Sequence, residues 1–118
     1  MAERIAITVS ELTDLSAPMD PRFGRAAGFL VVQDGEVLTV SKNSAVLASH
    51  GAGTGAASLM QELGVGKVIS GAFGPKASSA LTEMGITMLL APAGLTAAEA
   101  LERAGRGELQ VQALRVIR

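Results

Sequence analysis

From residue 55 onward the sequence alternates between helix-like and strand-like segments, and this alternation limits the possible folds more than any other feature. The segments are separated by glycine or proline, and they predict a helix over residues 55–63, a strand over 65–70, a helix over 75–84, a strand over 86–90 and a helix over 96–104. Strands joined through helices pair in parallel with right-handed crossovers. The second half of the chain therefore predicts a parallel sheet.

The first half adds strands that are not separated by helices. Residues 4–9 are rich in β-branched side chains and predict a buried strand. Residues 29–33 and 36–40 flank Asp34-Gly35, and Asp-Gly between two apolar runs predicts a hairpin, since both positions of a type I′ turn need positive φ. The predicted order is strand, strand, strand, helix, strand, helix, strand, helix. This order belongs to the α/β class, with a five-stranded mixed sheet.

Local signals predict where the helices begin and end. Gly64 and Gly85 each follow a helical pattern and are predicted to be left-handed C-terminal caps. Pro75 suits the first position of a helix, where a missing amide costs nothing. Thr96 and Glu99 have the spacing of a capping box, which predicts the start of the last helix.

The strand directions place the long loops together. If the first strand runs upward, residues 10–27, 41–54, 71–74 and 91–95 all lie at the upper edge, whereas the lower edge has only tight turns. Ligands of open α/β sheets bind outside the carboxyl ends of the parallel strands. Two helices also begin at the upper edge, and helix N-termini attract anions. We therefore expect an anion site there, reached by five basic residues: Arg22, Arg25, Lys42, His50 and Lys76.

Composition excludes several classes of function. The chain has 118 residues and a net charge of −1, with 3% aromatic residues and no tryptophan or tyrosine, which argues against a nucleic-acid binder. It has no cysteine, which excludes disulfides and thiolate metal sites. No apolar run is long enough for a membrane span and no signal peptide is evident, so we expect a cytoplasmic protein with no membrane partner. We expect one domain over residues 1–108 and a tail over 109–118. Residues 109–117 alternate weakly, which is compatible with an extra strand or with an arm for a partner.

Residues 20–25 (Asp-Pro-Arg-Phe-Gly-Arg) are the first candidate ligand-binding segment, because two permanently charged guanidiniums flank an aromatic ring. His50 is the only histidine, and with Met19 it is a candidate metal ligand. Gly51 and Gly53 do not have the spacing of a dinucleotide-binding fingerprint. Asp14 and Asp20 lie in a loop, and residues 5–9 carry no acid, so catalysis by a two-metal nuclease site is disfavoured.

Three motifs at consistent spacing resemble the dinitrogenase iron–molybdenum cofactor biosynthesis family, which includes NifX- and NafY-type carriers. They are residues 20–26, residues 50–53 and residues 70–77, and the resemblance covers residues 4–108. It implies an RNase H-like three-layer α/β fold with helices on both faces of the sheet. It also implies binding of a preformed metal–sulfur cluster and no enzymatic activity. Within the family, the small size and the absence of cysteine are most similar to members that carry a molybdenum–copper sulfide cluster without covalent attachment.

By position, the resemblance implies cofactor-binding roles for three groups of residues: Arg22, Phe23, Gly24 and Arg25; His50, Gly51 and Gly53; and Gly71, Phe73, Gly74 and Lys76. Many relatives have a histidine where this chain has Arg22, so direct coordination from that loop is replaced by outer-sphere contact with an anion. The cofactor implied is a molybdenum–copper sulfide cluster or a related Mo/Fe–S cluster.

Two other functions stay open on the sequence. One is a regulatory or interaction module that binds ATPases, a division apparatus or other proteins of the same pathway through residues 109–118 without a cluster. The other is a degenerate RNase H-like nuclease. The first predicted strand offers little support for it, because residues 5–9 carry no acidic side chain.

Overall fold

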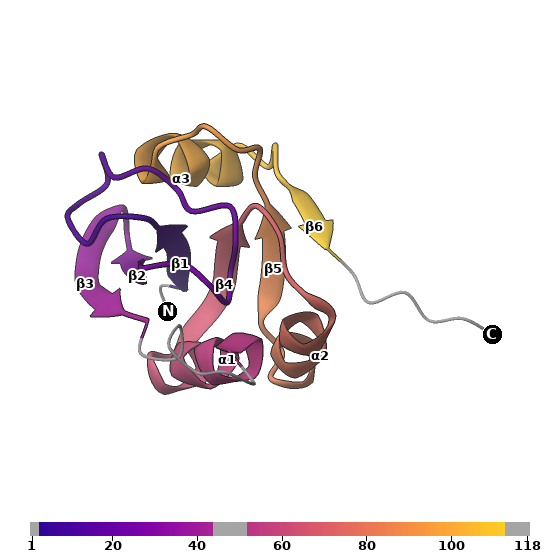
Figure 1. The fold of residues 1–118 in the computed structure, drawn as a ribbon. Coiled ribbons are helices and arrows are strands. Elements are labelled where there is room, and N and C mark those ends of the chain that lie inside the picture. Colours follow the sequence, from indigo (N-terminus) through magenta and orange to yellow (C-terminus); the bar gives the residue numbers. More distant parts are fainter. Residues whose placement is uncertain (1–2, 44–51, 113–118) are drawn as a thin grey trace.

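The computed structural model describes residues 3–43 and 52–112 (Figure 1). The described residues form strands and helices in the order β1 (Arg4–Val9), β2 (Gly28–Gln33), β3 (Glu36–Lys42), α1 (Ala52–Glu62), β4 (Val65–Ser70), α2 (Pro75–Glu83), β5 (Thr87–Leu90), α3 (Ala97–Gly105) and β6 (Gln110–Gln112). One sheet contains all these strands in the order β3-β2-β1-β4-β5-β6. β1 pairs in parallel with β4, and β4 with β5, as predicted.

The sheet differs from the prediction in its number of strands. The described residues form six strands and not five, because β6 pairs antiparallel with β5 inside the segment predicted as a tail. The side-chain amide Nε2 of Gln112 donates a hydrogen bond to the Ser78 hydroxyl on α2 at 2.6 Å. The weak alternation of residues 109–117 left an extra strand and an arm for a partner as alternatives, and the pairing of residues 110–112 with β5 shows the strand.

The start of α1 also differs from the prediction. The helix begins at Ala52, three residues before the predicted start at Gly55, so Gly53 is a helical residue and not a loop residue. Glycine disfavours a helix interior by about 1 kcal/mol relative to alanine, which is why this segment read as a loop. Ala56, Ala57 and Met60 are fully buried, and their packing outweighs this local preference.

The predicted turns and caps are confirmed. Asp34 and Gly35 both have positive φ, at 55° and 79°, as the hairpin turn requires. Pro75 is the first residue of α2, and Gly85 behind that helix has φ 74°. Thr96 and Glu99 form both hydrogen bonds of the capping box at the start of α3.

Each face of the sheet carries its own apolar core, because side chains alternate between the faces of a strand. On β2, Phe29 and Val31 join the core under α1 and α2, whereas Leu30 and Val32 join the core under α3. The sheet accordingly lies between α3 on one side and α1 and α2 on the other (Figure 1). This three-layer arrangement leaves the ends of the strands as the accessible edges. None of the described helices is long and apolar enough to cross a bilayer.

Candidate ligand-binding site

Three loops meet at the edge of the sheet where β1, β4 and β5 end. The Phe23 amide donates to the Ala72 carbonyl at 3.1 Å, which joins the loop after β1 to the loop after β4. The Met19 amide donates to the Leu95 carbonyl at 2.9 Å, which joins the first loop to the one after β5. The predicted clustering of these loops is therefore confirmed. Of the predicted loop over residues 41–54, residues 44–51 lie outside the described part of the chain.

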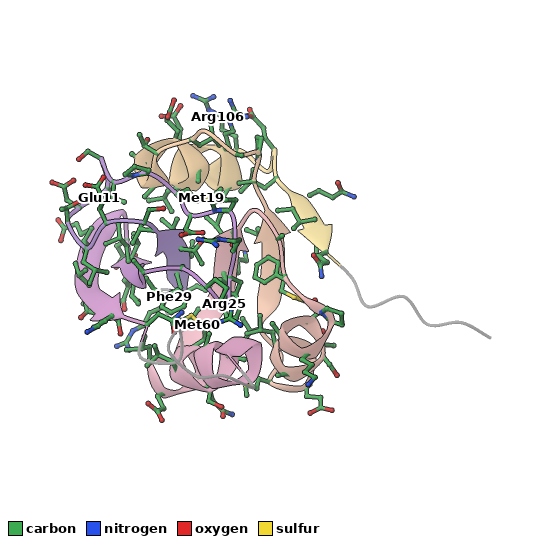
Figure 2. All side chains as sticks on the ribbon, in the orientation of Figure 1. Glu11, Met19, Arg25, Phe29, Met60 and Arg106 are labelled. Carbon is green, nitrogen blue, oxygen red and sulfur yellow. The ribbon has the colours of Figure 1, made fainter. Side chains whose placement is uncertain are left out.

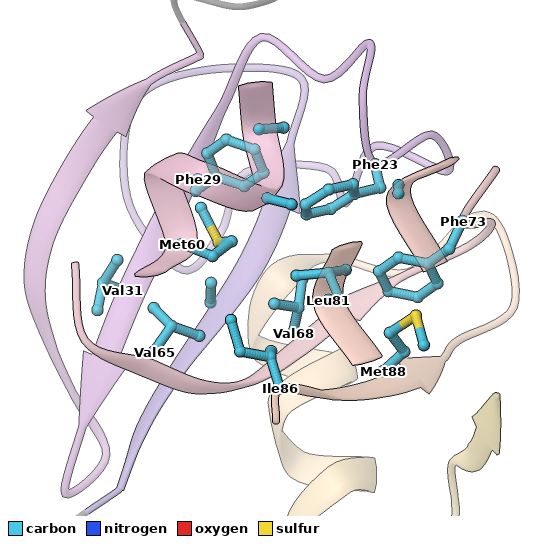
Figure 3. Close-up of a cluster of buried hydrophobic side chains, with 14 residues drawn as sticks. Phe23, Phe29, Val31, Met60, Val65, Val68, Phe73, Leu81, Ile86 and Met88 are labelled. Carbon is cyan, nitrogen blue, oxygen red and sulfur yellow. The ribbon is translucent and has the colours of Figure 1, made fainter. Parts of the chain in front are cut away.

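The segment over residues 20–25, called the arginine loop below, is anchored by the ring of Phe23. The ring is 1% exposed and lies 5.3 Å from the Phe73 ring and 5.7 Å from the Phe29 ring, centroid to centroid. Figure 3 shows Phe23 between the other two rings, above Leu81 and Val68. Phe73, for which the resemblance implies a cofactor-binding role, is 8% exposed and belongs to the same core. The rings of Phe23 and Phe73 therefore support the site from beneath.

The carboxylate of Asp20 organises the start of the arginine loop. Its Oδ1 accepts a hydrogen bond from the Arg22 amide at 2.9 Å and lies 3.4 Å from Arg22 Nε. Its Oδ2 accepts a hydrogen bond from the Ser10 hydroxyl at 3.2 Å. The Asp20 side chain is only 5% exposed, whereas that of Arg22 is 66% exposed. A buried acid thus holds the base of an exposed guanidinium at the rim of the site.

Beneath Asp20 lies a polar contact inside the sheet. The Thr8 hydroxyl on β1 donates to the Asp20 carbonyl at 2.6 Å and lies 3.0 Å from the Ser70 hydroxyl at the end of β4. Both hydroxyl-bearing residues are fully buried. Because a buried polar group without a partner is costly, these contacts fix the path of the loop over the strand ends. Sequence reasoning missed Thr8 and Ser70, since both fit an ordinary strand pattern.

Asn43, which directly follows β3, holds the other end of the arginine loop. Its side-chain amide donates to the carbonyls of Gly24 at 3.2 Å and Ala26 at 3.0 Å, and its own amide donates to the Ala27 carbonyl. The residue is fully buried. A lone asparagine after a strand carries no signal that separates such a role from a turn, so the sequence could not single it out.

The loop after β4 forms the second side of the site. A Cβ atom on Gly71 would lie 2.8 Å from the Pro21 Cα and 2.9 Å from its carbonyl oxygen, so only glycine lets the two loops approach this closely. Gly74 is the N-cap of α2, and as a glycine it offers no side chain to cap the first amides. In α2, whose residues are all described, the first turn has no acidic side chain, and Lys76 there is exposed. This helix start is electrostatically suited to an anion.

The remaining predicted site residues fall in three places. Arg25 lies at the end of the arginine loop (Figure 2). Its side chain is exposed, and Gly24 beside it is half-buried. Met19 is 3% exposed and belongs to the core under α3, and its role as a metal ligand stays a prediction. His50 and Gly51 lie outside the described residues, and Gly53 is in the first turn of α1.

The carboxylates of the long loop are used in local structure. Asp14 accepts hydrogen bonds from the hydroxyl and the amide of Ser16, and these lower the pKa of its carboxyl. The Asp20 carboxylate accepts hydrogen bonds from the Arg22 amide and the Ser10 hydroxyl. Among residues 3–43 and 52–112, no three His, Cys, Asp or Glu side chains come together in a way that could hold a metal ion. The exposed side chains of Arg22, Arg25 and Lys76 offer positive charges to an anion at this edge.

Comparison with known proteins agrees with this picture. Residues 3–107 match the family described as dinitrogenase iron-molybdenum cofactor. The chain therefore belongs to this family, which confirms the resemblance drawn from its three motifs.

Within solved structures, the chain is similar to the apo form of the orange protein from Desulfovibrio gigas, with 37% identity, a TM-score of 0.89 and coverage of 96% of this chain and 95% of that one. It is also similar to a NifB-like protein from Thermotoga, with 28% identity, a TM-score of 0.80 and coverage of 98% of each chain. A curated relative, an uncharacterized protein of Methanocaldococcus jannaschii, is 35% identical over 85 residues, which are 64% of this chain and 72% of the relative.

Proposed function

We propose that this protein is a non-enzymatic carrier of an anionic, molybdenum-containing metal–sulfur cluster, held without covalent attachment at the edge where the arginine loop meets the start of α2. Membership of the iron–molybdenum cofactor family and similarity to the orange protein support a role in binding a cluster. A molybdenum–copper sulfide is the cargo that the sequence resemblance favours. The same proposal includes an RNase H-like fold. It also includes other proteins of a cofactor pathway as partners.

The observation that carries the proposal is the direct connection between the two sides of the site. A backbone hydrogen bond from Phe23 to Ala72 and the packing of the Phe23 ring against Phe73 hold the two loops together. The arginine loop and the start of α2 therefore keep a fixed relation to each other. Such preorganisation lowers the entropy that binding costs.

The kind of contact follows from the side chains at hand. Guanidinium and ammonium groups donate hydrogen bonds to an anion but do not coordinate metals, since they have no lone pair to offer. Arg22, Arg25 and Lys76 supply three positive charges against the one negative charge of Asp20. The carrier then neutralises the cluster from outside and leaves its metal–sulfur bonds intact. His50, outside the described residues, stays the predicted metal contact.

The test is reconstitution of the full chain with tetrathiomolybdate and a copper salt. The wild-type protein should give a coloured complex that survives desalting and weakens as salt is raised, because exposed charges are screened. Charge-assisted hydrogen bonds contribute about 1.5–3 kcal/mol each, so Arg22→Ala with Arg25→Ala should weaken binding on the order of 100-fold after allowance for exposure.

The matched control is Arg103→Ala with Arg106→Ala, which removes two exposed arginines from the far end of α3. This control should bind like the wild type and show the same dependence on salt. If both double variants retain the complex equally, the arginine loop does not hold the cluster and the electrostatic proposal is wrong.

A further inference from the structure

Asn43 is a buried asparagine that donates hydrogen bonds to three carbonyl groups of one short segment. Its side-chain nitrogen Nδ2 donates to the carbonyls of Gly24 at 3.2 Å and Ala26 at 3.0 Å. Its backbone amide donates to the Ala27 carbonyl at 3.0 Å. Asn43 is 0% exposed, so these three oxygens point toward the interior of the protein. The segment over residues 24–27 includes Arg25, so the contacts act on the backbone that carries the second guanidinium of the site.

These hydrogen bonds set the direction of the peptide groups on both sides of Arg25. The described residues have no cis peptide bond, and in a trans peptide the carbonyl and the following amide point in nearly opposite directions. Because the Gly24 carbonyl is directed at buried Asn43, the Arg25 amide is directed to the other side of the backbone. The Ala26 carbonyl and the Ala27 amide are arranged in the same way. An anion beside the exposed Arg25 side chain therefore does not meet the negative ends of these two peptide dipoles.

The two arginines of the loop depend on different anchors. The Asp20 carboxylate holds the start of the loop through the Arg22 amide at 2.9 Å. Asn43 holds the end of the loop, beyond the buried ring of Phe23. Lys76, the third cation at this edge, is in the first turn of α2 and so belongs to a separate element. A change at Asn43 should therefore act on Arg25 and leave Lys76 in place.

We propose that Asn43 is a positioning residue of the anion site, which presents Arg25 to the cargo and keeps the nearby carbonyl oxygens turned inward. Its ligand rests on the proposed function, whereas its hold on residues 24–27 does not require any cargo. A buried carbonyl without a donor is costly. Without the Asn43 amide, the carbonyls of Gly24 and Ala26 therefore turn toward water on the exposed side of the loop. Oxygens there repel an anion, and Arg25 loses its fixed place.

The first experiment is a double-mutant cycle, read as retention of the complex formed with tetrathiomolybdate and a copper salt. Arg25→Ala should weaken binding about tenfold in the wild-type chain, because it removes one exposed charge-assisted contact. In an Asn43→Ala chain the same substitution should weaken binding less than about twofold, since residues that act together are not additive. Lys76→Ala is the control and should have the same effect in both chains. A general loss of stability would leave the effect of Arg25→Ala unchanged.

The second experiment is amide hydrogen exchange of the full chain without cargo. The amide of residue 43 donates to the Ala27 carbonyl, and the Ile86 amide behind α2 donates to the Leu81 carbonyl at 2.9 Å. After correction for intrinsic rates, the residue 43 amide of Asn43→Ala should exchange about tenfold faster relative to the Ile86 amide than in the wild type. Leu30→Ala, which removes a fully buried side chain from the core under α3, should leave this ratio unchanged.

Far-UV circular dichroism checks that every variant is folded. If Asn43→Ala does not fold, Asn43→Ser, which keeps one hydroxyl donor, takes its place in both experiments with smaller shifts in the same direction. The inference is overturned if Arg25→Ala acts equally in both chains, if the effect of Lys76→Ala shrinks as well, or if the exchange ratio stays at the wild-type value. If the wild type retains no cluster but the exchange ratio rises as expected, the proposed cargo is wrong and the positioning of residues 24–27 by Asn43 is still supported.

Discussion

The role of Phe23 gives the sharpest test of how the site is built. The family resemblance implies a cofactor-binding residue, but the ring is 1% exposed and contacts two other buried rings, so its effect on binding is expected to be indirect. Truncating a buried phenylalanine to alanine costs about 3–5 kcal/mol, from lost transfer free energy and the cavity that remains. A domain of this length has a total stability of roughly 6–18 kcal/mol. The Phe23→Ala variant should therefore still fold, but its free energy of unfolding should be much lower than that of the wild type.

The assay is guanidinium unfolding followed by circular dichroism, together with cluster reconstitution at low denaturant. Phe29→Ala is the matched control, because Phe29 is fully buried in the same core but lies on β2 and not in the arginine loop. Both variants should lose about 3–5 kcal/mol of stability. Only Phe23→Ala should also lose cluster retention while still folded, because it releases the loop that carries Arg22 and Arg25.

Two results would refute this reasoning. If Phe23→Ala costs less than about 1 kcal/mol, the ring does not anchor the loop, since such a value lies well below the range for a buried phenylalanine. If Phe23→Ala and Phe29→Ala weaken cluster retention equally, the effect comes from general instability and not from the position of the loop. Phe23→Leu, which keeps most of the volume, should cost less than about 1.5 kcal/mol and retain the cluster.

Two further predictions concern the loop contact and the last helix. Gly71→Ala should destabilise the fold by about 1–3 kcal/mol in urea unfolding, because the added Cβ would lie 2.8 Å from Pro21 Cα, whereas Gly105→Ala meets nothing within 4 Å and should be neutral or slightly stabilising. Equal effects of the two substitutions would contradict the close approach of the loops. Hydrogen bonds from the Thr96 amide and hydroxyl lower the pKa of the Glu99 carboxyl. The ionised carboxylate therefore stabilises the fold fully above the unfolded-state pKa of about 4.3. This stabilisation is lost as the pH falls through the lower folded-state pKa. The difference in Tm between wild type and Glu99→Gln should shrink over that range, and a difference that does not change with pH would contradict this assignment.

The sequence predicted those parts of the fold that depend on neighbouring residues. The Asp34-Gly35 turn, Pro75 at the start of α2 and the capping box at Thr96 each follow from chemistry within four residues. The strand order then placed three loops at one edge without any knowledge of contacts. This is why the meeting of these loops could be predicted before their contacts were known.

The features that the sequence did not predict depend on contacts between segments that are distant in the chain. β6 is short, and Gln112 contacts Ser78, which is 34 residues away in sequence. Asn43 reaches back 17 and 19 residues to hold two carbonyls of the loop. No local pattern separates such residues from ordinary polar ones. The same holds for Phe23, for which the resemblance implies a cofactor-binding role and which its tertiary neighbours place in the core.

The loop after β1 contributes to both cores, and this has a consequence for the rates of binding. Met19 packs under α3, and Phe23, four residues later, packs against the opposite face of the sheet under α1 and α2 (Figures 2 and 3). A segment tied to both layers cannot swing open without disturbing both, so among the described residues the loop after β1 does not act as a lid over the proposed cargo. The rate at which the proposed cargo associates with this loop is then set by diffusion and charge. If the proposed cargo binds here, we expect its release to follow a change in charge balance or transfer to a competing acceptor, because the loop after β1 is held in place by both cores.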